Sequence, residues 1–93
     1  MKNVRAHLVI AGRVQGVFFR YTMQEVASSF NVTGWVKNRW DGKVEAVLEG
    51  DKENVEKVIE WSYHGPPAAV VEDVQIVWEK YSGEFSHFSI RYS

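Results

Sequence analysis

The spacing of apolar residues changes several times along this chain, and the order of those changes limits the folds it can adopt. Residues 4–11 alternate like a half-buried strand, whereas the apolar positions over residues 19–30 lie three and four apart, as in an amphipathic helix. Two alternating runs then flank Asp41-Gly42, a pair suited to the positive φ angles of a tight hairpin turn. A second helical pattern and two more alternating runs follow. The positions expected to face inward are Val4, Ala6, Leu8 and Ile10; Phe19, Met23, Val26, Ala27 and Phe30; Val44, Ala46 and Leu48; Val55, Val58, Ile59 and Ser62; Val74, Ile76 and Trp78; and Phe88 and Ile90.

These patterns predict a strand, a helix from about residue 20 to 30, a hairpin, a helix over residues 52–64 and a long strand. Asp51 can cap the second helix, and Gly65-Pro66-Pro67 ends it. With right-handed crossovers, the βαββαβ order favours an α+β, ferredoxin-like sandwich. We expect an antiparallel sheet with both helices on one face and a short extra C-terminal strand, all in a single domain of residues 1–93.

This topology predicts where chemistry can occur. The first two strands run parallel with the third between them, so their C-terminal ends share one edge of the sheet. The loop that begins at Gly12 leaves one of those ends, and Asn38 lies at the other.

Composition excludes several functions. The 93 residues carry 11 Lys+Arg and 12 Asp+Glu, a net charge of -1, so no overall basic field attracts nucleic acid or an anionic membrane. The absence of cysteine excludes disulfides, thiolate metal sites and a thiol nucleophile. No stretch is long and apolar enough for a signal peptide or a membrane span. We therefore expect a soluble, cytoplasmic protein, and as a separate expectation we take it to be a monomer.

The stretch "GRVQGVFFR", residues 12–20, combines features of an anion site. Gly12 and Gly16 allow backbone angles that let successive N–H groups converge, and the following helix adds its unpaired N-terminal donors. Arg20 stands where the helix dipole disfavours a cation, unless an anion lies between the two. The alternative is a surface arginine whose stem covers apolar area. The spacing matches neither a Walker loop nor a dinucleotide fingerprint.

Asn38 also has two readings. Asparagine is depleted in strands, yet the hairpin register puts Asn38 on the same helix-facing side as Gly34 and Val36. One reading is a side chain at the rim of a site. The other is a hydrogen bond to nearby backbone ahead of the turn.

The segments "GRVQGVFFR" and "GWVKNRWDGKVEAVLEG", together with "GPPAAVVEDV" and the C-terminal "FSIRY", resemble the acylphosphatase family over essentially the whole chain. The resemblance implies hydrolysis of the carboxyl-phosphate bond of acyl phosphates, with no metal, no cofactor and no covalent intermediate. By this resemblance, Arg20 binds the phosphate and Asn38 positions the attacking water. Phe18 and Trp40 match variable positions, and their bulk bears on the mouth of the site. The loop expected to cradle the phosphate consists of Val14, Gln15, Gly16, Val17, Phe18 and Phe19.

The residues themselves agree with that chemistry. No cysteine, histidine or aspartate nucleophile motif lies near the loop, so water must attack. An acyl phosphate expels a carboxylate whose conjugate acid has a pKa near ~4, so it needs no general acid. The expected partners are a small acyl phosphate and its product, inorganic phosphate. His7, His64 and His87 show no spacing for shared metal ligation.

Two rival functions share this fold. RNA-recognition modules have the same element order but stack bases on strand aromatics. The face away from the helices, formed by Arg5, His7 and Val9 with Lys43, Glu45, Val47 and Glu49, is expected to lack aromatics and to be partly acidic. The second rival is a non-catalytic phosphate- or anion-sensing or partner-binding module, such as the acylphosphatase-like modules inside larger maturation enzymes.

Overall fold

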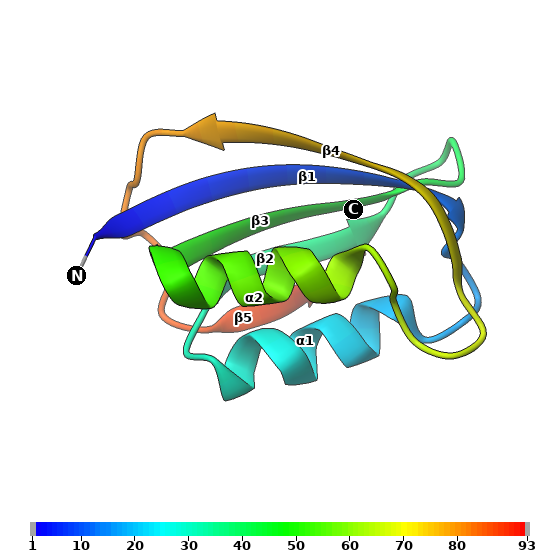
Figure 1. The fold of residues 1–93 in the computed structure, drawn as a ribbon, viewed down its shortest axis with the longest axis horizontal. Coiled ribbons are helices and arrows are strands. Elements are labelled where there is room, and N and C mark those ends of the chain that lie inside the picture. Colours follow the sequence, from blue (N-terminus) through cyan, green and yellow to red (C-terminus); the bar gives the residue numbers. More distant parts are fainter. Residues whose placement is uncertain (1, 93) are drawn as a thin grey trace.

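The computed structural model describes residues 2–92 and contains the expected order of elements (Figure 1). Five strands form one sheet in the order β4-β1-β3-β2-β5, and both helices lie on the same face of it. The elements are β1 (Asn3–Arg13), α1 (Phe19–Ser29), β2 (Thr33–Asn38), β3 (Val44–Asp51), α2 (Lys52–Ser62), β4 (Val70–Glu79) and β5 (Phe88–Arg91).

The sheet confirms the ferredoxin-like arrangement and adds one detail. β3 pairs antiparallel with both β1 and β2, so β1 and β2 run parallel to each other. β4 pairs antiparallel with β1, but β5 pairs parallel with β2. The four main strands are therefore antiparallel, as expected, and the short C-terminal strand makes the whole sheet mixed.

The helices bury the predicted faces. In α1, Phe19, Met23 and Ala27 are buried, and Val26 and Phe30 pack against the same core. In α2, the buried residues are Val55, Val58, Ile59 and Ser62. Asp51 occupies the N-cap position of α2, but its side chain makes no capping hydrogen bond.

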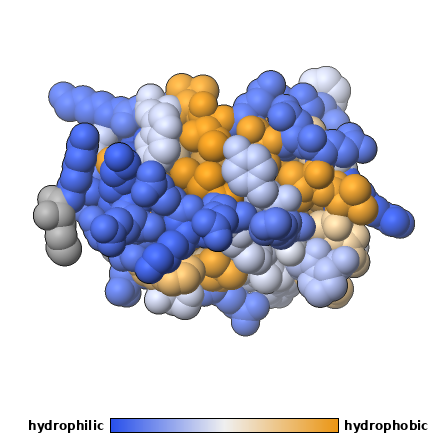
Figure 2. Space-filling view, viewed as in Figure 1, coloured by the Kyte–Doolittle hydropathy of each residue, from blue (hydrophilic) through white to orange (hydrophobic). Residues whose placement is uncertain are grey.

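The β4 edge of the sheet is the least covered. α2 packs on β1 and β3, and α1 packs on β2 and β5, so neither helix lies over β4. Val74, Ile76 and Trp78 do share the helix-facing side, opposite Ile10, Leu8 and Ala6 of β1, but Trp78 stays half exposed. Figure 2 accordingly shows apolar surface above α2, on the side where β4 lies in Figure 1.

Two turns differ from the simplest expectation. In the hairpin, only Gly42 has a positive φ, and the turn spans Arg39 to Lys43, whose backbone groups bond at 2.8 Å. Gly12 belongs to β1 rather than to the following loop. A bulge lies between Ala11 and Gly12. Gly12 has a φ of 124°, and a Cβ added to it would stand 2.2 Å from the carbonyl oxygen of Val70. Gly12 is therefore needed for strand pairing.

No helix within residues 2–92 is both long and apolar enough to cross a membrane.

Candidate active site

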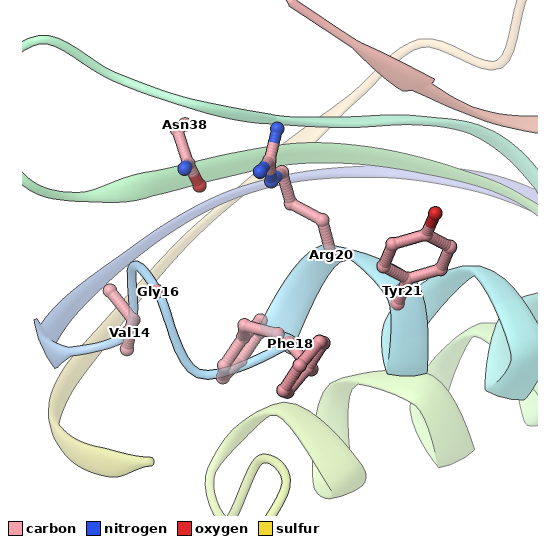
Figure 3. Close-up of a pocket in the computed structure, with 7 residues that line it drawn as sticks. Val14, Gly16, Phe18, Arg20, Tyr21 and Asn38 are labelled. Atoms are coloured by element: carbon pink, nitrogen blue, oxygen red, sulfur yellow. The ribbon is translucent and has the colours of Figure 1, made fainter. Parts of the chain in front are cut away.

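The loop between β1 and α1 and the end of β2 enclose a small cavity at one edge of the sheet (Figure 3). Its volume is about 200 Å³. The expected topology accounts for this meeting, because β1 and β2 run parallel and end at the same edge. The lining residues are Val14, Gly16, Phe18, Phe19, Arg20, Tyr21 and Asn38.

The loop leaves a run of backbone donors unpaired. Gly16 has φ 74°, and Phe18, the residue that precedes α1, has φ 65° and ψ 24°. Within residues 2–92, the backbone N–H groups of residues 15–20 donate to no protein acceptor. Backbone N–H groups at the start of a helix attract anions, because the helix dipole adds to their partial positive charge. The cavity is therefore suited to an oxyanion.

Arg20 brings a full positive charge to this cavity. The first turn of α1 contains no acidic residue, and within residues 2–92 the guanidinium forms no salt bridge. Its Cζ instead lies 5.2 Å from the centre of the Tyr92 ring, a cation–π contact. A guanidinium has the planar donor geometry that matches two oxygens of a phosphate.

Asn38 supplies the polar group at the opposite side of the cavity. It lies at the end of β2, opposite Val44, and its Oδ1 is buried without a protein partner within residues 2–92. The turn is held by Asp41, whose Oδ1 accepts from the Lys43 N–H at 3.2 Å and whose Oδ2 accepts from Arg39 at 2.8 Å. A buried carbonyl without a donor is costly. The unpartnered Oδ1 of Asn38 argues against a hydrogen bond to the turn backbone and favours a role in binding a ligand or water in the cavity.

Two of the expected loop residues do not line the cavity. Val17 is buried in the core. Gln15 turns toward the hairpin, where its Nε2 donates to the carbonyl oxygens of Arg39 at 2.7 Å and Lys43 at 2.9 Å. The Gln15 side chain thereby ties the loop to the hairpin that carries Asn38.

Comparison with known proteins identifies the family of this chain. The acylphosphatase family model matches residues 6–90. The chain belongs to the acylphosphatase family. It is 60% identical over 91 residues to an acylphosphatase of Pyrobaculum islandicum, a match that covers 97% of this chain and 96% of the relative. The crystal structure of the Bacillus subtilis acylphosphatase superposes with a TM-score of 0.92 at 36% identity, covering 96% of this chain and 99% of the other.

The same module also occurs inside a larger protein. A crystal structure of HypF from T. kodakarensis matches 95% of this chain with a TM-score of 0.82 and 31% identity, but the match covers only 12% of HypF. The relative from Pyrobaculum is covered almost completely. This chain is thus an enzyme of the acylphosphatase family that hydrolyses acyl phosphates to a carboxylate and inorganic phosphate.

Sequence reasoning missed two aromatic residues at this cavity. Tyr21 lines the cavity beside Arg20, and Tyr92 stacks on the guanidinium from the end of the chain. Tyr21 directly follows Arg20 in the first turn of the helix, and this position could have indicated that Tyr21 lies at the cavity. Tyr92 gave no signal, because its contact depends on how the segment after β5 returns to α1.

The face away from the helices is partly covered and not free of aromatics. Trp35 of β2 lies there, 4.8 Å from the Arg91 guanidinium and edge-on to His7. The expectation that this face lacks aromatics was therefore wrong, because it considered only the strands corresponding to β1 and β3. The acidic character is confirmed, since His7 lies between Glu45 at 2.6 Å and Glu79 at 3.2 Å.

Glu49 on this face is completely buried beneath the connection between β4 and β5. Burial alone would raise the pKa of its carboxyl. Donors from Ser82, Arg5 and Gly83, at 2.8 to 3.2 Å, together outweigh burial and lower that pKa. Glu49 thus fixes the covering segment to the sheet, at a distance from the site.

Proposed function

We propose that Arg20 and the backbone of loop 14–19 bind the phosphate of an acyl phosphate, while Asn38 holds the attacking water. The observation that carries the proposal is the cavity itself. Unpaired backbone donors and Arg20 lie on one side, and the unpartnered Oδ1 of Asn38 lies on the other. Val14, Gly16, Phe18 and Phe19 line the cavity, whereas Gln15 and Val17 support the loop from outside it.

The reaction in this arrangement is an in-line displacement at phosphorus. The Asn38 oxygen accepts a hydrogen bond from water and aims a lone pair at the phosphorus atom. A bond forms from the water oxygen to phosphorus, and the bond from phosphorus to the acyl oxygen breaks with its electron pair. Arg20 and the loop N–H groups stabilise the charge spread over the other phosphate oxygens. The lining includes no carboxylate and no histidine, so we assign the water proton to a phosphate oxygen of the substrate.

The leaving group explains why so few residues are enough. A carboxylate leaves as a stable anion and needs no proton, whereas an alkyl phosphate ester releases an alkoxide that does. A site with a cation, backbone donors and an amide therefore favours acyl phosphates over ordinary phosphate esters.

We further propose that residues 1–93 act as a single domain and that the protein is a cytoplasmic monomer without a nucleic-acid partner. The face used by RNA-recognition modules carries Glu45 and Glu79, which would repel a phosphate backbone, and the segment between β4 and β5 covers part of it over Glu49. A phosphorylated substrate is also confined to the compartment that makes it, because membranes strongly oppose the passage of charge. Light scattering and cell fractionation test these points.

Hydrolysis of benzoyl phosphate by the purified protein, in the presence of a chelator, tests the proposed mechanism. We expect turnover without added metal and competitive inhibition by inorganic phosphate. Loss of activity in EDTA that returns with a divalent ion would refute the metal-free mechanism. Phosphate binding without turnover would instead support a non-catalytic anion-sensing module.

A further inference from the structure

Two large aromatic side chains stand exposed at the cavity. Phe18 is 74% exposed and Tyr21 is 62% exposed, yet both line the same cavity as Arg20 and Asn38. Apolar rings at this exposure gain little from the fold, because most of their surface remains in water. Their contribution to stability therefore does not account for them.

The backbone at Phe18 makes the aromatic choice more unusual. Its φ of 65° and ψ of 24° lie in the left-handed region. Glycine and asparagine adopt this region at low cost, whereas a bulky side chain is disfavoured there. Gly16, two residues earlier, takes a similar φ of 74°. Neither backbone conformation nor burial therefore favours phenylalanine at this position, and an outlier of this kind at a cavity indicates a functional role.

In-line geometry indicates what that role is. If Asn38 holds the attacking water, the acyl group must leave from the opposite side of the phosphorus atom. In Figure 3, Tyr21 lies on the far side of Arg20 from Asn38, and Phe18 lies below Arg20, at the start of α1. The acyl group of a bound substrate would emerge toward these two rings.

We propose that Phe18 and Tyr21 form an acyl-group subsite that favours planar, apolar acyl groups, aromatic ones above all. An aromatic acyl group can lie against the two rings and remove apolar surface from water, which a small acyl group such as acetyl cannot do. The exposed Tyr21 keeps its hydroxyl hydrated while its ring contacts the substrate. The inference rests on the proposed mechanism, because it uses the direction in which the leaving group departs.

The test compares kcat/KM for benzoyl phosphate and acetyl phosphate in four proteins: the wild type, Phe18→Asn, Tyr21→Ala and Trp40→Ala. Trp40 is the matched control, because it is 97% exposed in the nearby hairpin and, unlike Phe18 and contrary to the expectation from its bulk, does not line the cavity. The ratio of the two kcat/KM values cancels any change common to both substrates. In each subsite variant we expect the benzoyl-to-acetyl ratio to fall about 5- to 10-fold, the scale of losing part of one ring contact. The ratio should not change in Trp40→Ala.

Stability against urea provides a second measurement, in which a functional and a structural role for the Phe18 ring predict opposite changes. Asparagine suits the left-handed backbone at position 18, so Phe18→Asn should unfold at the same or a higher urea concentration than the wild type. A structural role for the ring would instead lower that midpoint. An unchanged substrate ratio in both subsite variants overturns the inference, as does an equal loss for both substrates. If the wild type hydrolyses neither substrate, the proposed mechanism fails first, which is a distinct result.

Discussion

Replacing Asn38 with alanine separates catalysis from stability. The Oδ1 of Asn38 is buried and has no protein donor within residues 2–92, so alanine removes no hydrogen bond at that atom. An unsatisfied buried carbonyl costs about 1–3 kcal/mol, and its removal offsets the packing lost from a partly buried side chain. We therefore expect the free energy of unfolding to stay within about 1 kcal/mol of the wild type, or to rise.

The rate should respond very differently. Without the amide, no side chain aims the water at phosphorus, and kcat should fall about 10²-fold, or ~2.7 kcal/mol in activation free energy. The phosphate-binding loop and Arg20 are untouched, so inorganic phosphate should inhibit with a Ki close to that of the wild type. Steady-state assays with benzoyl phosphate, phosphate inhibition and urea melts on one preparation give all three quantities.

Asp41→Ala is the matched control, because it lies in the same hairpin and does bond the turn. Asp41 accepts hydrogen bonds from Lys43 and Arg39, so this variant should unfold at lower urea and keep the wild-type kcat. The two variants thus predict opposite patterns. An Asn38→Ala protein that is clearly destabilised but turns over normally would refute the water-positioning role.

Three further substitutions test other parts of the structure. Arg20→Lys keeps the charge but loses the two-pronged donor geometry, so KM for benzoyl phosphate and Ki for phosphate should rise and kcat should fall; near-normal kinetics would make Arg20 a surface residue. Gln15→Leu removes two hydrogen bonds to the hairpin and should lower the free energy of unfolding by about 1–2 kcal/mol, with a larger effect on kcat than on KM. A Gln15→Leu enzyme with unchanged kcat would show that the link serves stability alone. The lowered pKa of Glu49 stabilises the fold above the ordinary carboxyl value of 4.5, and this contribution is lost as pH falls through the lowered value. Urea melts from pH 7 to pH 3 should therefore show a smaller acid-dependent loss in Glu49→Gln, and equal losses would argue against this role.

The element order was predictable because the spacing of apolar residues in each segment matches the helix or strand that the segment forms. The inner positions of α2, Val55 through Ser62, illustrate this, since every one predicted is buried. The half exposure of Trp78 was not predictable from alternation, which assigns a face but does not reveal whether a helix covers it. The parallel pairing of β5 likewise depends on the path of the segment after β4, which carries no periodic pattern of its own.

The cavity was predictable to the extent that it follows from topology. Arg20 and Asn38 lie far apart in sequence, but the parallel β1 and β2 end at the same edge, and the structure brings both residues to one cavity. The separate roles of neighbouring loop residues were not predictable. Gln15 and Val17 alternate with Val14 and Gly16, and only the fold shows that one pair turns away from the cavity that the other lines.

The position of Arg20 connects the stability of the fold to its chemistry. A cation in the first turn of α1 opposes the helix dipole, and no acidic side chain in that turn offsets it. The neighbouring loop N–H groups add partial charge of the same sign. The Tyr92 ring contacts the guanidinium, and within residues 2–92 no carboxylate forms a salt bridge with it. All of these costs fall when a phosphate occupies the cavity, and they fall most when its negative charge is greatest. The arrangement that weakens the empty site is therefore the same one that stabilises the charge developing on the transferred phosphoryl group.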